Sequence, residues 1–130
     1  DMVGHTGHFQ ATVESVESVD KMLGLLEKEV LALGGALVVT ADHGNADEMS
    51  ERDKKTGAIL RDDKGLFIPR TSHSLNPVPL HIVLNDADRA RFVLNQIDQS
   101  SLANLASTSL HLLGFETPED YRESLIQAIR

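Results

Sequence analysis

The sequence predicts an α/β fold for this chain of 130 residues. One stripe of apolar residues, spaced three or four apart, indicates a long amphipathic helix near the start. Two short, continuously apolar runs, at 36–40 and 78–84, indicate strands that are buried on both faces. A helix that leads directly into such a strand is typical of layered α/β proteins.

The first helix is expected at about 8–33. Charged side chains fall mostly off the apolar stripe, and Gly34 and Gly35 supply a helix stop. The stripe consists of Phe9, Val13, Val16, Val19, Leu23, Leu26, Val30 and Leu33.

The first strand follows at once, and the second begins near Pro79, which belongs at a strand start or an edge because it has no N–H to donate. About 35 polar residues separate the two strands, too many for a simple connection, so we expect a functional excursion. Within it, the apolar triplets at 58–60 and 66–68 flank a polar turn and predict a small hairpin.

The last part of the chain reads as one short strand and two helices. Residues 92–94 predict the strand, and a helix is expected from Ser101 to Leu113, stopped by Gly114. A final helix is expected from Thr117 and Pro118, a hydroxyl cap followed by proline in the first turn. It would carry Tyr121, Leu125 and Ile129 on one face.

Composition excludes several functions. Twenty acidic residues against twelve basic ones give a net charge of −8, which repels nucleic acid and anionic lipid, so we expect neither as a partner. No apolar run has the length of a membrane span, and we expect a soluble, cytoplasmic protein. The absence of cysteine excludes disulfides and thiolate metal sites.

Potential metal ligands occur in three clusters, around residues 1–5, 41–45 and 71–74. Asp42 and His43 follow the carboxyl end of the first predicted strand, where open α/β sheets carry their ligands. Carboxylate and imidazole together suit Mn²⁺, Zn²⁺ or Mg²⁺. The clusters hold more donors than one ion needs, so a pair of adjacent ions could share them, as in phosphoryl-transfer sites.

Plainer interpretations exist for every candidate. Asp42 and His43 could belong only to a turn completed by Gly44. Asp1 and His5 could be a helix cap and a histidine in the field of the helix, and His73 could be an ordinary loop residue. Three further histidines have the positions of structural or solvated side chains and are not expected to bind metal: His8, His81 and His111.

Three motifs in this order resemble the cofactor-independent phosphoglycerate mutases, members of the alkaline phosphatase superfamily. They are Asp-Met-Val-Gly-His-Thr-Gly at 1–7, Thr-Ala-Asp-His-Gly-Asn-Ala-Asp at 40–47, and His-Ser-x-Asn-Pro-Val-Pro at 73–79. The segment at 101–114 is similar to that family's final helix. The resemblance implies an alkaline-phosphatase-like layered fold of which 1–130 is only the C-terminal portion.

The resemblance also implies two divalent ions, usually Mn²⁺, with Zn²⁺, Co²⁺ or Mg²⁺ as alternatives. Asp1, His5 and His73 would bind one ion, and Asp42 and His43 would contribute to the other. The family interconverts 3-phosphoglycerate and 2-phosphoglycerate in glycolysis through a phosphoserine intermediate. Phosphoglycerate would thus be the partner of the full-length enzyme.

The chain departs from the family pattern in two respects. It begins at Asp1, and the serine nucleophile and the basic substrate-binding domain would precede it, so we expect the fragment alone to be inactive. Ser72 and Ser74 lack the nucleophile context and are given no catalytic role. The stretch 52–70 is longer than in many members.

Three hypotheses therefore stand. The first is the metal-binding part of a phosphoglycerate mutase. The second is another enzyme of the superfamily, a phosphopentomutase, phosphatase or phosphodiesterase. The third is a non-catalytic metal-binding or interaction module. If the chain is a fragment of such an enzyme, apolar surface left uncovered by the missing half would favour self-association.

Overall fold

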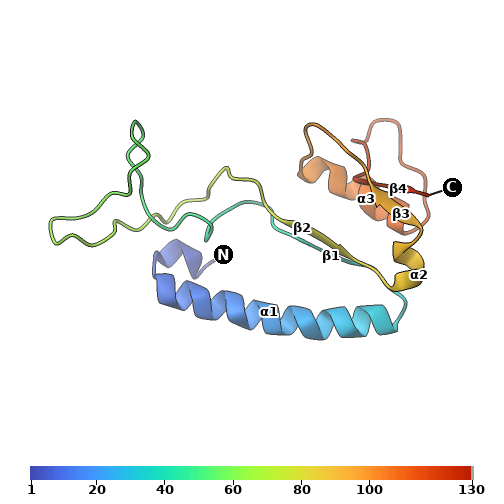
Figure 1. Ribbon diagram of the computed structural model, residues 1–130, viewed down its shortest axis with the longest axis horizontal. Helices are drawn as coiled ribbons and strands as arrows, with labels where there is room; N and C mark the ends of the chain where they lie inside the picture. Colours follow the sequence, from blue (N-terminus) through green and yellow to red (C-terminus); the bar gives the residue numbers. More distant parts are fainter. Residues whose placement is uncertain (130) are drawn as a thin grey trace. The chain divides into compact units, whose positions relative to one another are not determined.

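A computed structural model describes residues 1–129 of the chain (Figure 1). The chain forms η1 (Gly4–Thr6), α1 (Phe9–Ala32), β1 (Leu37–Thr40), β2 (Leu80–Val83), α2 (Asp86–Arg89), β3 (Phe92–Leu94), η2 (Leu102–Asn104), α3 (Leu105–Leu112) and β4 (Ile126–Ala128). β1 pairs with β2, and β3 pairs with β4. The predicted mixture of helices and strands is confirmed.

The described residues divide into two compact units. Unit 1 comprises Asp1–Leu26 and Val39–Leu80, and unit 2 comprises Glu27–Val38 together with the chain from His81 onward. Unit 1 contains η1, most of α1 and the long excursion between β1 and β2. Unit 2 contains α2, β3, η2, α3 and β4.

Helix α1 confirms the helix predicted at about 8–33. At its start the Ala11 N–H donates to Nδ1 of His8 at 3.1 Å, and at its end Gly34 takes a left-handed φ of 72°. Its apolar stripe, however, is largely open to solvent: Phe9 is 67% exposed and Val19 is 64% exposed. The stripe thus forms the predicted helix, and much of it remains exposed in the structure of residues 1–129.

The two predicted strands also form, but they are not buried on both faces. The first three residues of β1 are half-buried and Thr40 is exposed, while β2 exposes His81. A two-stranded sheet offers each strand only one paired edge, and the described residues of both strands are half-buried or exposed.

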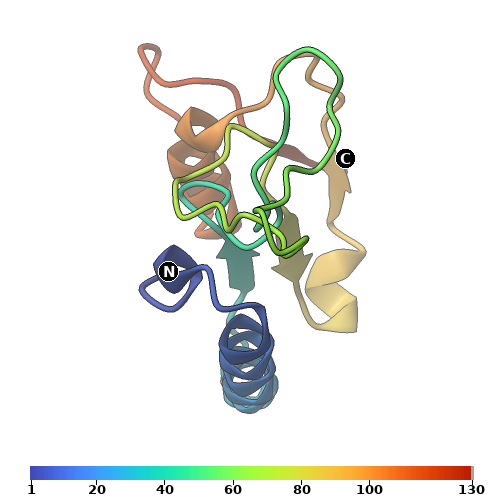
Figure 2. The same cartoon turned by 90° about the vertical axis from the view of Figure 1, so that its left-hand side faces the viewer.

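The excursion in unit 1 is drawn as loops in Figure 2, and isolated antiparallel bridges join its two sides. Isolated bridges join Ser50 to Pro69 and Arg61 to Phe67, and the Ile68 N–H donates to the Leu60 carbonyl at 3.1 Å. The predicted small hairpin is thus present as a bridged turn. Aspartates close its loops: Asp53 accepts from two backbone N–H groups, at 2.7 and 2.9 Å.

In unit 2 the helix predicted from Ser101 is confirmed as η2 continued by α3. The Ser101 N–H donates to Oδ1 of Asn104 at 2.7 Å, which supplies the cap, and Gly114 ends the helix with a φ of 81°. The sequence did not predict the short helix α2, which is capped by Asn85, whose side chain accepts from the Asp88 N–H.

The predicted final helix is wrong. Thr117 and Pro118 lead only into a turn, and the chain then extends into β4, whose register with β3 pairs Leu94 with Ile126. Side chains from elsewhere in unit 2 form hydrogen bonds with backbone N–H and C=O groups that would be paired with one another in a helix. Ser107 donates to the Arg122 carbonyl, Asn104 to the Glu123 carbonyl, Asn95 to the Ser124 carbonyl, and Thr108 accepts from the Leu125 N–H.

The core of the described residues is small. Leu125 and Ile126 are its buried hydrophobic side chains, and most other buried side chains are polar and hydrogen-bonded, such as Thr108 and Asn104. Within residues 1–129, no helix combines the length and the apolar composition that crossing a bilayer requires.

Candidate metal centre

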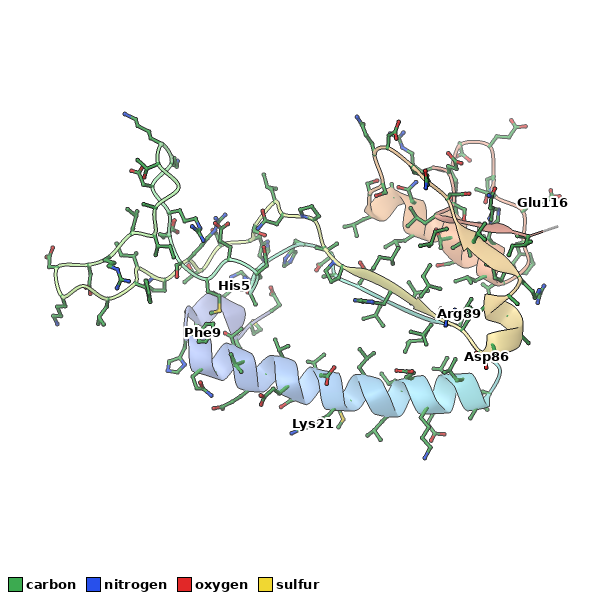
Figure 3. All side chains as sticks on the ribbon, viewed as in Figure 1. His5, Phe9, Lys21, Asp86, Arg89 and Glu116 are labelled. Carbon is green, nitrogen blue, oxygen red and sulfur yellow. The ribbon has the colours of Figure 1, made fainter. Side chains whose placement is uncertain are left out.

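All five predicted ligand residues lie in unit 1, on three segments far apart in the sequence. Asp1 precedes η1 and His5 lies within it, Asp42 and His43 follow β1, and His73 lies near the end of the excursion, before β2. The short η1 brings His5 back to the first residue: its N–H donates to the Asp1 carbonyl at 3.2 Å. Figure 3 shows His5 on the segment that precedes α1.

Two glycines let these segments approach each other. A Cβ on Gly4 would collide with the side chain of Asn45, two residues after His43. Gly7 ends η1 with a φ of 68°, and a Cβ there would lie 2.5 Å from Cβ of Pro69. The opening segment therefore packs against both of the other ligand-bearing segments, and glycine is required for that approach.

The imidazoles converge on one carboxylate oxygen. Oδ1 of Asp1 lies 3.2 Å from Nε2 of His5, 3.7 Å from Nε2 of His73 and 3.9 Å from Nε2 of His43. One ligand atom from each of Asp1, His5 and His73 lies within 4.8 Å of the other two. The predicted first ligand set is thus brought together by the fold.

The orientation of His5 suits a metal ligand. Its Nδ1 lies 2.5 Å from the Thr71 carbonyl oxygen, which can only accept, so Nδ1 carries the proton and Nε2 keeps its lone pair. That Nε2 faces Nε2 of His73 at 3.1 Å. Two nitrogens at this distance need a proton or a cation between them, and with the Asp1 carboxylate alongside, the donor set fits a divalent ion.

Asp42 and His43 form the second pair of candidates. Nε2 of His43 lies 3.5 Å from Oδ1 of Asp42, and the His43 ring stacks on that of His73 with centroids 3.4 Å apart and planes 19° from parallel. The Asp42 side chain is 85% exposed. This pair offers two donors, fewer than the four that a tetrahedral ion takes, so it would be only part of a site.

The surroundings of His73 lower the pKa of its imidazole. Partial loss of solvent around the ring lowers this pKa most, and the nearby His43 and His5 lower it further, against a smaller opposing effect of Asp42. A neutral imidazole is the form that binds metal. The pKa shift therefore favours the ligand-competent state.

The other three histidines do not join the cluster of Asp1, His5 and His73. His8 caps α1, His81 is exposed on β2, and His111 contacts Oγ1 of Thr117 at 3.1 Å in unit 2. Ser72 accepts from Nε of Arg70 at 3.2 Å. His8, His111 and Ser72 thus have hydrogen-bond partners outside that cluster.

The sequence reading missed the polar residues that surround the candidate ligands. Asp47 binds the side chains of Ser74 and Asn76, and Glu48 forms an ion pair with Arg70 at 2.7 Å. The partners are separated by 22 to 29 residues. Neither helical nor strand periodicity relates residues at such separations, although Asp47, Ser74 and Asn76 lie within the motifs at 40–47 and 73–79.

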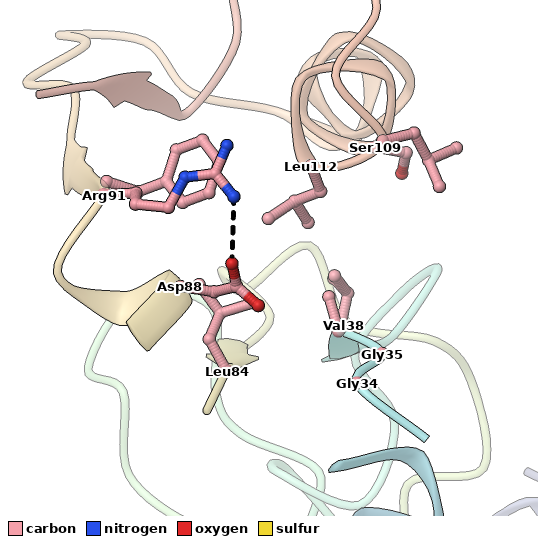
Figure 4. Close-up of a pocket in the computed structure, with 11 residues that line it drawn as sticks. Gly34, Gly35, Val38, Leu84, Asp88, Arg91, Ser109 and Leu112 are labelled. Atoms are coloured by element: carbon pink, nitrogen blue, oxygen red, sulfur yellow. Dashed lines mark hydrogen bonds and ion pairs between the residues drawn. The ribbon is translucent and has the colours of Figure 1, made fainter. Parts of the chain in front are cut away.

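A cavity of about 460 Å³ lies in unit 2 (Figure 4). Its lining is largely apolar, with an ion pair between Asp88 and Arg91 at 3.0 Å. None of the five candidate ligands lines it. The cavity is therefore distinct from the candidate metal centre.

Comparison with known families agrees with this geometry. A family model described as Metalloenzyme superfamily matches residues 1–117. The chain belongs to the Metalloenzyme superfamily. The match takes in all three ligand-bearing segments, from Asp1 to beyond His73, and membership implies that divalent metal is bound.

Three curated proteins to which the chain is similar are named as phosphoglycerate mutases or probable ones. The 2,3-bisphosphoglycerate-independent phosphoglycerate mutase of Trypanosoma brucei brucei is 45% identical over 98% of the chain, and a probable one from Leptospira interrogans is 49% identical over the same share. The corresponding enzyme of Mesembryanthemum crystallinum is 42% identical over 99%. The chain spans 23% of the length of each of these curated relatives.

A solved structure gives the same result. Leishmania mexicana phosphoglycerate mutase, studied at low cobalt concentration, matches with a TM-score of 0.89 and 46% identity, over 99% of the chain and 23% of that protein. The fold expectation is confirmed: the chain has the mixed α/β structure of one part of a phosphoglycerate mutase, consistent with a partial alkaline-phosphatase-like fold.

Proposed function

We propose that the chain is the metal-binding C-terminal part of a cofactor-independent phosphoglycerate mutase, which interconverts 3-phosphoglycerate and 2-phosphoglycerate in glycolysis. The observation that carries the proposal is the convergence of Asp1, His5 and His73, from segments 68 residues apart, around one carboxylate oxygen. The names of the relatives support the choice of reaction.

In this proposal Asp1, His5 and His73 bind one divalent ion, and Asp42 and His43 supply two ligands of another. Mn²⁺ is the expected metal, and the study of the Leishmania mexicana enzyme at low cobalt concentration supports Co²⁺ as a substitute. Bound ions of this kind lower the pKa of a nucleophile and offset the charge on a phosphoryl group.

The chain's own residues hold that centre in shape. The Thr71 carbonyl fixes the proton of His5 on Nδ1, which leaves Nε2 directed at the centre. The stacked rings of His43 and His73 keep the two ligand sets adjacent. Two adjacent ions held by these residues would stabilise the attacking and leaving oxygens of an in-line phosphoryl transfer.

The remaining parts of the reaction fall outside these residues. The serine nucleophile and the basic substrate-binding domain would belong to the remainder of a longer, cytoplasmic protein, in which 1–130 is the C-terminal segment of the metal-binding domain. The exposed stripe of α1, including Phe9 and Val19, supports self-association of the fragment when it is alone.

The test measures isomerisation by the longer protein. Phosphorus NMR should detect conversion of 3-phosphoglycerate to 2-phosphoglycerate with Mn²⁺ or Co²⁺, and chelation should abolish it. His5→Asn and His73→Asn should each lower kcat/KM by more than about 100-fold, since removing a ligand costs more than removing its support. His81→Asn is the matched control, because His81 is exposed on β2, and it should keep full activity.

Two results would contradict the proposal. Release of inorganic phosphate without isomerisation would indicate a phosphatase of the same superfamily. Undiminished activity in His73→Asn would show that the convergence of the three side chains has no catalytic role.

A further inference from the structure

The turn that follows His43 carries two adjacent carboxylates, and each binds the segment around His73. The Glu48 N–H donates to the Asn45 carbonyl at 3.3 Å, which closes the turn. Asp47 and Glu48 then project from it as neighbours in sequence. Their partners are Ser74 and Asn76 for Asp47, and Arg70 for Glu48.

The first set of contacts joins the side chain of Asp47 to those of Ser74 and Asn76. Oδ2 of Asp47 accepts from Oγ of Ser74 at 2.7 Å and from Nδ2 of Asn76 at 2.6 Å. Ser74 is only 4% exposed, and its N–H donates to the Gly44 carbonyl at 2.8 Å. Gly44, which follows His43, is therefore hydrogen-bonded to Ser74, which follows His73. Asp47 adds a second hydrogen bond to Ser74.

The second contact set acts on the other side of His73. Nη1 of Arg70 bonds Oε2 of Glu48 at 2.7 Å, while Nη2 of the same side chain donates to the His73 carbonyl at 3.2 Å. His73 itself is an exposed loop residue with no helix or strand to hold it. Its position opposite His5 and against His43 thus depends on these neighbouring contacts.

We propose that Asp47 is a positioning residue, which through Ser74 sets His73 against His43 and so fixes the spacing of the two ligand sets. The inference rests on the proposed function for the metal role of the histidines, and it adds a residue outside the ligand sets. Both hydrogen bonds fall on one oxygen of Asp47, so an asparagine can retain them through its amide oxygen whereas an alanine cannot.

The test uses Co²⁺ binding to the longer protein, followed by visible absorption, because the absorption bands report the geometry of the ligands. Asp47→Ala should weaken Co²⁺ binding by about 10–100-fold and alter the bands. Asp47→Asn should keep the wild-type spectrum and an affinity within about threefold. Circular dichroism and the metal-free Tm record whether each variant is folded, and Ser74→Ala replaces Asp47→Ala if that variant is unfolded.

Asp53 supplies the matched control. Its Oδ1 also accepts several hydrogen bonds, from Lys55 and Thr56, but none from a residue beside a candidate ligand. Asp53→Ala should therefore leave the Co²⁺ spectrum and affinity unchanged.

The outcomes separate this inference from the proposed function. Equal Co²⁺ binding in Asp47→Ala, Ser74→Ala and the wild type would overturn the positioning role alone. A shifted spectrum in a protein that does not isomerise phosphoglycerate would support the positioning role and refute the mutase. A wild-type protein that binds no Co²⁺ would overturn both.

Discussion

Gly44→Ala tests how closely the candidate metal centre is packed. Gly44 is buried, and its φ is not in the left-handed region, so alanine can adopt the same backbone. The added methyl group is the whole perturbation. It would collide with Oγ of Ser74 and lie 2.7 Å from Oδ1 of Asp47, where ordinary contact begins at 3.4 Å. The methyl group therefore displaces both partners of the bond between Asp47 and Ser74.

The expected loss of stability is about 2 kcal/mol. Overpacking of one methyl group costs about 1–3 kcal/mol. The displaced hydrogen bond to a carboxylate adds about 1 kcal/mol, reduced because Asp47 is exposed. Against these losses, alanine restricts the unfolded chain and returns about 0.4–1 kcal/mol. For a chain of this size the net change lowers Tm by roughly 8 °C.

The assay is thermal unfolding of the metal-free chain, followed by circular dichroism, with Gly24→Ala as the matched control. Gly24 lies inside α1 with nothing within 4 Å of an added Cβ. The same chemical change there should stabilise the chain by about 0.5–1 kcal/mol through helix propensity alone. A Gly44→Ala variant with an unchanged or higher Tm would refute the close packing of Gly44, Ser74 and Asp47.

Two further predictions concern stability. Ile126→Ala should lower the free energy of unfolding by about 2–4 kcal/mol, because Ile126 is 3% exposed in β4. Ile129 is 52% exposed, so Ile129→Ala should change that free energy by less than about 0.5 kcal/mol. Urea unfolding of both variants measures the difference. Hydrogen bonds from Ser74 and then Asn76 lower the pKa of Asp47 below its usual 3.8, so its stabilising effect is complete above pH 3.8 and is lost as pH falls through the folded pKa. The Tm difference between wild type and Asp47→Asn should accordingly shrink below pH 3.8, and a difference that grows on acidification would contradict the assignment.

Local patterns predicted most of the elements because each of those elements depends on local rules. The period of the apolar stripe was sufficient to predict α1, and short apolar runs were sufficient to predict β1, β2 and β3. The prediction of a helix from Thr117 was wrong because it rested on local signals for a helix start, and side chains distant in sequence oppose those signals. Asn104 and Thr108 hold that backbone extended, and no local pattern encodes their reach.

In the candidate site, too, some residues could be predicted from local sequence and others could not. Asp42 and His43 could be predicted from their place at the carboxyl end of β1. His73 could be assigned only through the family resemblance, because its neighbours in sequence are ordinary loop residues. What selects it is the approach of His5 and the contacts of Ser74 and Arg70, which exist only after the chain has folded.

The bridge between Gly44 and Ser74 has a consequence for how this protein can vary. Once that bridge closes, the ends of the excursion are fixed whatever its length. Doubling a flexible loop costs only about 0.6 kcal/mol in closure entropy, and the turns at Asp53 and Asp62 are closed by their own carboxylates. The long stretch 52–70 is thus free to gain or lose residues at its tips, while the histidines at its base keep their places.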